Sequence, residues 1–288
     1  MDPTVTIITP TYNIVENNQT DDFNLLLSLI ERQTYLDIEH IIIDNASNDG
    51  TAELLKNYKN KGYLNFISER DTGKFSAYNK GIMRAKGKYI SFISCDDFYH
   101  DITAIADVVK FMETEQADFL LSSAYCRHPQ GFTFLFAPAI YNAFQVMPCA
   151  RQGMFFKKSV LEKEGYFDER FKTMSDFDLI IRLFMRQYKP LIFPGNFTTY
   201  KLGVKISENS ERTVEETKLI FIKNYKRFYP QLDDETLTAM VNLSEFPQQL
   251  LEKLAQFYPE QDHQYFLDSC EKMHSLRVDA MKQMYNQQ

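Results

Sequence analysis

Hydrophobic residues in the first hundred positions alternate between a spacing typical of buried strands and one typical of amphipathic helices. Short runs of β-branched and aromatic residues predict strands at Val5–Thr9, Ile41–Ile43, Tyr63–Ile67 and Tyr89–Ile93. Apolar residues at helical spacing predict intervening helices at Phe23–Ile30, Ala52–Tyr58 and Ser76–Ala85. We expect Pro10 to end the first strand, because proline cannot extend a central strand. Repeated strand–helix–strand units predict an α/β fold with a mostly parallel central sheet flanked by helices.

The pattern changes along the rest of the chain. It predicts a strand at Phe119–Tyr125, a helix at Asp176–Arg186, and further helices at Glu215–Phe228, Pro247–Phe257 and His263–Met284. The aromatic run Phe132–Phe136 is expected to pack in the core, with an acceptor groove as the alternative. These patterns predict a domain over residues 1–207, divided near residue 100, and a helical C-terminal extension over residues 208–288.

Polar residues follow each of the first four predicted strands. They lie at Thr11–Asn13, Asp44–Asp49, Glu69–Lys74 and Cys95–Asp97. In parallel sheets, ligands bind beyond the carboxyl ends of the strands. The sequence therefore predicts a ligand site at this edge of the sheet.

Two of these strand ends carry carboxylates that suggest specific chemistry. Asp96 and Asp97 follow a buried strand, and adjacent carboxylates are costly there unless they are solvated, paired or bound to a cation. A hard divalent metal fits them, although capping of the helix that begins near Asp101 is the alternative. Asp44 directly ends a buried strand and is able to accept hydrogen bonds from a nucleobase, whereas Ser47–Gly50 is explained by a turn and a helix cap.

Composition excludes several other classes of protein. The net charge is -7 and the pI is near 5.4, which argues against a nucleic-acid partner. Four scattered cysteines contain no C-x-x-C pair, so we expect no zinc knuckle and reduced thiols in the cytoplasm. The N-terminus does not resemble a signal peptide, and no apolar run approaches the roughly 20 residues of a membrane span. Thr72-Gly73-Lys74 lacks the remaining residues of a phosphate-binding P-loop.

Taken together, the motifs resemble the family 2 glycosyltransferases, which have the GT-A fold. The resemblance rests on Thr6–Asn13, Ile41–Thr51, Ser68–Gly73, Tyr78–Ile82 and Cys95–Asp97, in that order and spacing. Downstream, Arg151–Phe156 and Gly165–Glu169 resemble acceptor-side motifs, Ser175–Leu179 resembles the catalytic-base motif, and the match reaches about residue 210. Cys95 stands where a strict D-x-D motif has its first acid, although many relatives carry a small polar residue there, and Ser76 and Ser175 stand where relatives often have an acid.

The resemblance implies a role for each matching residue. Donor-binding roles fall on Thr9, Tyr12, Asn13, Asp44, Asp71, Lys74 and Asp96, and acceptor-side roles fall on Arg151, Gln152 and Gly153. Asp97 would hold Mn2+ or Mg2+, and Asp176 would be the general base. Asp178 is the rival base, but it points about 200° away from Asp176 on a helix and is expected to pair with Arg182. A donor contact by Ser207, in a loose match to a Gly-Gly-x-Ser loop, stays open.

The expected function is that of a metal-dependent inverting hexosyltransferase in polysaccharide biosynthesis. A UDP-sugar is the favoured donor, because members of the family commonly use UDP-sugars. A glycan or lipid-linked acceptor of capsule or exopolysaccharide type is expected. Residues 1–100 would bind the nucleotide and residues 101–207 the acceptor. The expected location is cytoplasmic, and peripheral association with the inner membrane surface and a homodimer stay open. The alternatives are a nucleotidyltransferase, which needs no base at Asp176, and a catalytically silent nucleotide-sugar binding module.

Overall fold

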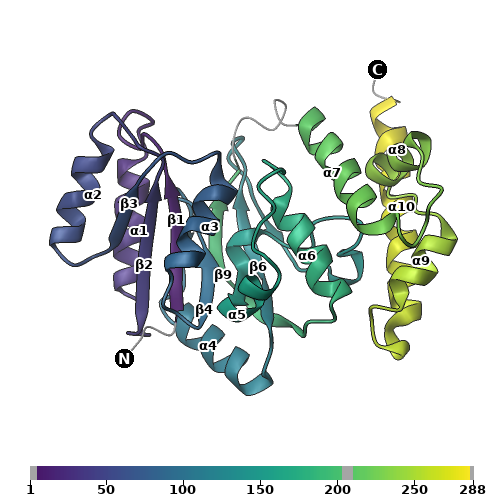
Figure 1. The fold of residues 1–288 in the computed structure, drawn as a ribbon, viewed down its shortest axis with the longest axis horizontal. Helices are drawn as coiled ribbons and strands as arrows, with labels where there is room; N and C mark the ends of the chain where they lie inside the picture. Colours follow the sequence, from purple (N-terminus) through teal and green to yellow (C-terminus); the bar gives the residue numbers. More distant parts are fainter. Residues whose placement is uncertain (1–4, 203–209, 286–288) are drawn as a thin grey trace. The chain divides into compact units, whose positions relative to one another are not determined.

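The computed structural model describes residues 5–202 and 210–285 of the 288-residue chain (Figure 1). Within these residues the chain divides into two compact units. The first unit holds residues 5–138, 149–172 and 188–202, and the second holds residues 139–148, 173–187 and 210–285. The predicted domain boundary at residue 207 lies outside the described residues and stays a prediction.

The first unit is built on one nine-stranded sheet with the order β3–β2–β1–β4–β8–β6–β9–β5, and β7 pairs with β6. Strands β1 (Val5–Thr11), β2 (Ile38–Asp44), β3 (Asn65–Ser68) and β4 (Tyr89–Phe92) are parallel to one another. They are connected through helices α1 (Thr20–Glu31), α2 (Thr51–Asn60) and α3 (Lys74–Arg84). The predicted α/β fold is therefore confirmed in the part of the chain where the hydrophobic pattern was clearest.

Strand β1 does not end at Pro10, as the sequence suggested, but continues to Thr11. In a parallel sheet, alternate residues of a strand bond to alternate neighbours. Thr11 O accepts from Asn45 N on the β2 side (2.9 Å), whereas Ile8 O accepts from Ile93 N on the β4 side (3.2 Å). The backbone nitrogen of Pro10 therefore points to the β4 side, where the pairing of β1 with β4 ends at Ile8. Its missing N–H costs no ladder bond, so proline is tolerated here.

The other half of the sheet is largely antiparallel. Strands β5 (Phe98–Tyr99), β6 (Phe119–Arg127), β7 (Thr133–Phe136), β8 (Met154–Lys157) and β9 (Pro190–Lys201) form it, with α4 (Ala104–Glu115) and α5 (Lys158–Lys163). Among the described pairings of this half, only β6–β9 is parallel, so the sheet as a whole is mixed and not mostly parallel as predicted. A short 3-10 helix, η2 (Arg151–Gly153), leads into β8.

The predicted core packing of the aromatic run is wrong. Phe132, Phe134 and Leu135 are 51%, 41% and 48% exposed. They belong to the turn before β7 and to β7 itself, which pairs only with β6 among the described strands. Because β7 lies outside the main strand order and none of its residues belongs to the described core cluster, its apolar side chains are left largely at the surface.

Helices cover both faces of the parallel strands. Because successive side chains of a strand point to opposite faces, neighbouring residues of β1 meet different helices. Ile7 belongs to the buried cluster that contains Phe23 of α1 and Val108 of α4. Ile8 points to the other face, where α3 packs. A Cβ at Gly81 would lie 2.5 Å from Ile8 Cγ2, so only glycine allows this close approach of α3 to β1.

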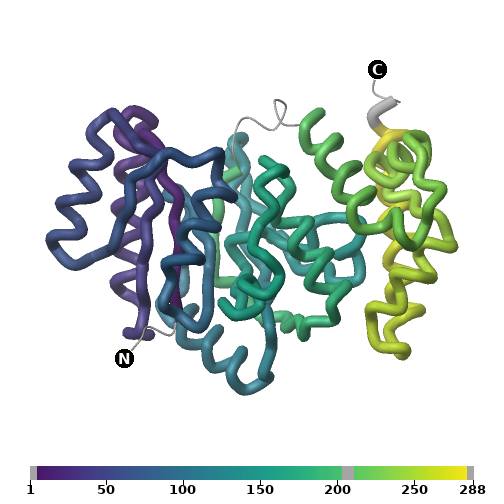
Figure 2. The backbone as a smooth tube through the Cα atoms, viewed as in Figure 1, coloured from purple at the N-terminus to yellow at the C-terminus, as the bar shows by residue number. Residues whose placement is uncertain are grey.

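The second unit is helical. It contains η1 (Ile140–Asn142), α6 (Ser175–Met185), α7 (Ser210–Tyr225), α8 (Asp234–Leu243), α9 (Gln248–Ala255), η3 (Glu260–Asp262) and α10 (His263–Tyr285). Figure 2 shows α10 running beside α8 and α9. Phe144 contacts the rings of Phe184, Tyr225, Tyr258 and Phe266, and Tyr225 Oη donates to Phe144 O (2.6 Å). The predicted helical C-terminal region is confirmed, and it has an aromatic core of its own.

Candidate donor and metal site

Asp44 joins the ends of three parallel strands. The register places Thr11 of β1 and Ser68 of β3 on either side of it. Its Oδ1 accepts from Thr11 Oγ1 (3.2 Å) and Ser47 Oγ, and its Oδ2 accepts from Ser47 N (3.0 Å) and Ser68 Oγ (2.6 Å). Asp44 is 0% exposed, and these four donors fill the roughly four acceptor positions of a carboxylate. A contact from Asp44 to a nucleobase therefore requires one of these hydroxyl groups to turn away.

The loops after β1 and β2 are tied together by Asn13. Its backbone N donates to Ser47 Oγ (2.8 Å), and its Oδ1 accepts from Asn48 N (3.2 Å). Asn13 has a φ of 48°, a left-handed conformation that asparagine adopts more readily than most residues. The preceding Tyr12 is 56% exposed, so the fixed loop presents an aromatic side chain to solvent.

Asp71 lies beyond the end of β3 in a tight turn. Its backbone N donates to Asn45 Oδ1 (2.8 Å), and its Oδ1 accepts from Gly73 N (2.9 Å). Gly73 has a φ of 134°, which favours glycine, and it precedes α3. Burial raises the pKa of Asp71, and the charges of Asp44 and Glu169 raise this pKa further. Three carboxylates therefore influence one another at this edge of the sheet.

Glu169, from the predicted acceptor-side motif, reaches the same region. Asn79 of α3 exchanges two hydrogen bonds with the backbone of Phe167 (2.9 and 3.0 Å) and donates to Glu169 Oε1 (3.0 Å). Thr72 Oγ1 donates to Glu169 Oε2 (3.2 Å). Burial acts to raise the pKa of Glu169, but hydrogen bonds from Asn79, Ser76 and Thr72 outweigh it and lower this pKa. Glu169 is thus held as an anion beside Asp71.

Asp97 is the most constrained carboxylate at the end of β4. It is 2% exposed. Its Oδ2 accepts from Gln152 Nε2 (2.7 Å) and more weakly from Ser94 N (3.4 Å), and its Oδ1 accepts from Lys201 N (3.0 Å). The lysine side chain of Lys201 lies 3.6 Å from Asp22 Oδ2. Asp97 therefore has a fixed orientation, and Oδ1 retains one of its two acceptor positions.

The electrostatics of this segment favour a cation. Burial raises the pKa of Asp97, although the hydrogen bond from Gln152 opposes this shift, and burial together with the charge of Asp97 raises the pKa of Asp96. Burial and both carboxylates also raise the pKa of the Cys95 thiol to about 12. A nearby cation would relieve this repulsion. Within the described residues, no three His, Cys, Asp or Glu side chains form a metal-ligand group, so Asp96 and Asp97 would provide only part of a coordination shell.

The three predicted acceptor-side residues have separate structural roles. Gln152 holds Asp97, and the positive charge of Arg151 acts to lower the pKa of Asp97. Arg151 lies over the ring of Tyr78 at 5.3 Å. A Cβ at Gly153 would lie 2.6 Å from Ser122 O of β6, so glycine is required by close packing of two backbone segments.

Asp176 and Asp178 lie in the second unit, in the first turn of α6. Asp176 is half-buried, and its Oδ1 accepts from Phe177 N (3.1 Å). Asp178 is 0% exposed and accepts from Arg182 Nε (2.9 Å), Lys223 Nζ (2.7 and 2.8 Å) and Asn224 Nδ2 (3.1 Å). The predicted pairing of Asp178 with Arg182 is confirmed, and its carboxylate is fully engaged.

The remaining predicted donor residues have surroundings of other kinds. Thr9 is buried, and its hydroxyl lies 3.0 Å from His40 Nε2. The Lys74 ammonium lies 4.8 Å from the centre of the Phe75 ring. Asp96 is half-buried, and Ser207 lies outside the described residues. Donor contacts by these residues stay predictions.

Sequence reasoning missed Asn79, Glu169 and Lys201 as parts of the site. Asn79 and Glu169 both lie in segments that were recognised, but no local pattern shows that α3 and the Gly165–Glu169 segment meet. Lys201 contributes its backbone N–H, a group that every residue except proline has, so no sequence signal marks it.

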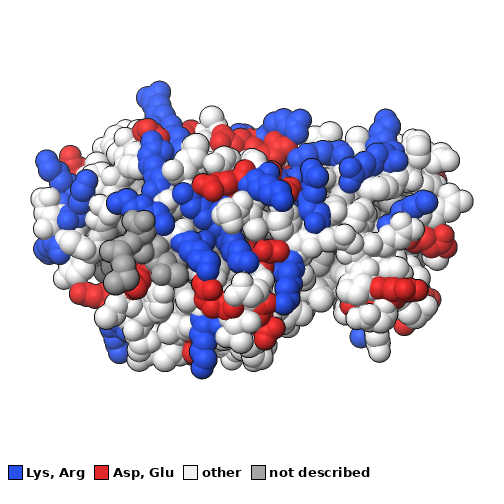
Figure 3. All heavy atoms as spheres, turned by 60° about the horizontal axis from the view of Figure 1, so that its bottom comes forward, with Lys and Arg blue, Asp and Glu red and all other residues white. Residues whose placement is uncertain are grey.

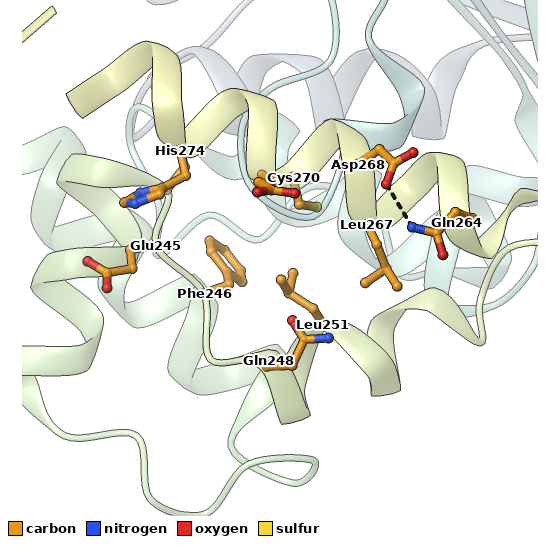
Figure 4. A pocket seen from close by; sticks show the side chains of 11 residues that line it. Glu245, Phe246, Gln248, Leu251, Gln264, Leu267, Asp268, Cys270 and His274 are labelled. Atoms are coloured by element: carbon orange, nitrogen blue, oxygen red, sulfur yellow. Dashed lines mark hydrogen bonds between the residues drawn. The ribbon is translucent and has the colours of Figure 1, made fainter. Parts of the chain in front are cut away.

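One face of the surface and one cavity of the second unit add to this picture. On the face drawn in Figure 3, Lys and Arg lie among Asp and Glu and do not form a separate basic stripe. A cavity of about 520 Å³ in the second unit lies between α10 and the α8–α9 connection, and the residues that line it include none of the predicted site residues (Figure 4). Among the described helices, none combines the length and the apolar character needed to cross a bilayer.

The mixed sheet, with acidic residues at the carboxyl ends of its parallel strands, defines an α/β protein with the GT-A fold. The model of glycosyl transferase family 2 matches residues 6–184. This match covers more than half of the chain, and the chain belongs to glycosyl transferase family 2.

Several proteins are similar to this chain in sequence. An uncharacterised glycosyltransferase from Rickettsia prowazekii is 29% identical over 195 residues, which cover 63% of this chain and 59% of the relative. A PGL/p-HBAD biosynthesis glycosyltransferase from Mycobacterium bovis is 26% identical over 185 residues, covering 63% and 70%. The UDP-Glc:alpha-D-GlcNAc-diphosphoundecaprenol beta-1,3-glucosyltransferase WfaP of Escherichia coli is 33% identical over 105 residues, covering 36% and 41%. The chain thus matches less than two thirds of the Rickettsia relative's length.

Solved structures share the fold. TarS 1–349 of S. aureus in complex with UDP-GlcNAc has a TM-score of 0.61 and 15% identity, with 97% of this chain and 92% of that chain covered. The mannosyltransferase PcManGT of Pyrobaculum calidifontis in complex with GDP-Man and Mn2+ has a TM-score of 0.57 and 16% identity, with 97% and 76% covered. At these identities the likeness shows the fold alone.

Proposed function

We propose that this protein is an inverting, metal-dependent glycosyltransferase that transfers a sugar from a UDP-sugar to a glycan or lipid-linked acceptor. The observation that carries the proposal is the fixed carboxylate of Asp97, which Gln152 and Lys201 orient at the end of β4. Family membership supports the reaction class. The UDP-GlcNAc bound by TarS and the diphosphoundecaprenol acceptor in the name of WfaP support the donor and acceptor classes.

In this proposal, the loop after β1 and the end of β2 hold the nucleoside. The exposed Tyr12 ring suits stacking on a base, and Asn13 fixes the loop that carries it. Asp44 would contact the base after Ser47 Oγ or Thr11 Oγ1 turns away. Asp71 and Lys74 would line the donor beyond β3 and at the start of α3.

Asp96 and Asp97 fit Mn2+ or Mg2+, because such ions take carboxylate oxygens and fill their remaining positions with water and substrate phosphate. When bound, the ion would neutralise charge that develops on the leaving diphosphate. Gln152 and the Lys201 backbone hold the Asp97 carboxylate in one orientation, and Oδ1 keeps one acceptor position for the ion. Arg151 would add a positive charge on the acceptor side.

Asp176 would remove the proton of the acceptor hydroxyl, and a single displacement assisted by one base inverts the anomeric carbon. In this proposal Asp178 does not act as the base, because its buried carboxylate already accepts from Arg182, Lys223 and Asn224. A polysaccharide pathway at the cytoplasmic face of a membrane, with a capsule or exopolysaccharide product, is the proposed setting.

The test is a panel of UDP-glucose, UDP-N-acetylglucosamine, UDP-galactose and GDP-mannose, assayed for nucleotide release with MnCl2 and with EDTA. We expect one UDP-sugar to be consumed, with activity lost in EDTA and in Asp97→Asn. Asp101→Asn is the matched control, because Asp101 is an exposed carboxylate in the same segment that bonds only locally to Thr103. Full activity in EDTA would remove the role given to Asp97.

Two further measurements separate the alternative classes. A nucleotidyltransferase would release pyrophosphate from UTP and a sugar 1-phosphate, whereas a silent module would show a UDP-dependent rise in melting temperature without turnover. At 100 times Kd, UDP should stabilise the fold by about 2.7 kcal/mol. Retention of transfer by Asp176→Asn would show that Asp176 is not the base.

A further inference from the structure

The turn that precedes α6 is held by a carboxylate from another helix. Glu216 of α7 is 6% exposed, and its Oε2 accepts three hydrogen bonds. The donors are Thr173 N (2.8 Å), Thr173 Oγ1 (2.7 Å) and Met174 N (3.0 Å). The backbone just before the first turn of α6 is therefore fixed by a residue more than 40 positions away in the sequence.

Local sequence does not provide this cap. The N-cap position of α6 is Met174, and no side chain of that residue caps the helix. Helix N-termini expose backbone N–H groups that usually bond to a nearby Ser, Thr, Asp or Asn side chain. A carboxylate is also favoured there by the helix dipole. Glu216 of α7 supplies an acceptor for the amide of the N-cap residue Met174 and for the amide of Thr173 before it.

A second set of contacts joins the same two helices after Asp176. Asp178 accepts from Lys223 and Asn224 of α7. Glu216 and Lys223 are seven residues apart, which places them on the same face of α7, two turns from each other. Side chains of α7 therefore bond to the chain two to three residues before Asp176 and two residues after it.

We propose that Glu216 is a positioning residue for Asp176, so that α7 belongs to the catalytic machinery and is not a separate appendage. The inference rests on the proposed function, in which Asp176 is the general base. A base must lie within hydrogen-bond reach of the proton that it removes, and a displacement of about 1 Å costs on the order of 100-fold in rate. Glu216 does not contact the acceptor in this proposal and acts through the backbone of the base turn.

The experiment measures kcat and KM for UDP release, with the UDP-sugar that the panel identifies, in Glu216→Ala, Glu216→Gln and Lys218→Met. Lys218 is the matched control, because its ammonium bonds to Asp234 and Thr238 of α8 and not to α6. We expect Glu216→Ala to lower kcat by about 10- to 100-fold with KM for the donor within about threefold. Glu216→Gln keeps an acceptor oxygen and should recover most of this loss, and Lys218→Met should keep the wild-type kcat.

The outcomes separate this inference from the proposed function. If Asp176→Asn abolishes turnover but Glu216→Ala keeps kcat within about twofold, the positioning role is refuted and the base assignment stands. If Asp176→Asn keeps turnover, both fail. A Glu216→Ala effect on KM alone would also refute positioning. Should Glu216→Ala not fold, Thr173→Val removes one of the three bonds, and an unchanged kcat in that variant would count against the proposal.

Discussion

Replacing Asp178 with asparagine should destabilise the protein strongly, although it leaves the shape of the side chain almost unchanged. The carboxylate is 0% exposed and accepts from Arg182, Lys223 and Asn224. Asparagine replaces one acceptor oxygen with an NH2 group, which would then face cationic donors. The substitution therefore removes a buried charge from its pair and leaves two cations facing a neutral group.

The expected magnitude follows from these contacts. Removing one partner of a buried ion pair typically costs about 3–5 kcal/mol. The Lys223 and Arg182 side chains are 30% and 16% exposed, so Lys223 is able to turn partly toward water, which favours the lower end of the range. A loss of about 3 kcal/mol corresponds to a fall in melting temperature of roughly 6–12 °C for a chain of this size.

The assay is thermal unfolding followed by circular dichroism, with Asp176→Asn as the matched control. Asp176 lies two residues earlier on the same helix turn and is half-buried, so its loss of charge at a helix N-terminus should cost only about 0.3–1 kcal/mol. A double-mutant cycle of Asp178→Asn with Lys223→Met should give a coupling energy of about 1–3 kcal/mol. A fall of less than about 2 °C in Asp178→Asn, or additive effects in the cycle, would refute the reasoning.

Three further predictions concern stability. Burial lowers the pKa of His40 from 6.5 to about 3. The stability gained by keeping His40 neutral in the folded protein is therefore complete above pH 6.5 and is lost as the pH falls toward 3. At pH 5 this loss amounts to about 2 kcal/mol of unfolding free energy. His40→Gln should therefore lose less stability than the wild type between pH 7 and pH 5 in urea titrations, and equal losses would contradict this. Gly153→Ala should cost about 2 kcal/mol or more, because its Cβ would meet Ser122 O at 2.6 Å, and an unchanged melting curve would show that the backbone gives way. Ser175→Ala should be neutral or stabilising by up to about 1 kcal/mol, because the buried Ser175 hydroxyl has no hydrogen-bond partner within the described part of the chain; a loss above 1 kcal/mol in chemical denaturation would contradict this.

The hydrophobic pattern of the chain is enough to predict the parallel half of the sheet. Runs such as Ile41–Ile43 are short, β-branched and apolar on both faces, a pattern that suits a strand covered by helices on both sides. Polar residues that follow such runs lie at the carboxyl ends of parallel strands, so the sequence alone predicts that Asp44 and Asp97 share one edge of the sheet. The pairing of Asp178 with Arg182 was likewise predictable, because residues four apart on a helix are neighbours.

Which distant residues meet these groups depends on how the elements pack in three dimensions. Gln152 and Lys201 reach Asp97 from 55 and 104 residues away, and Glu216 reaches Thr173 from 43 residues away. Pro10 was misjudged for the same kind of reason, because the side of the strand on which its missing N–H falls depends on where a neighbouring strand stops. Local spacing fixes the period and the direction of a side chain within one element. The partner it meets depends on register and packing between elements, which are set by the whole chain folding around its core.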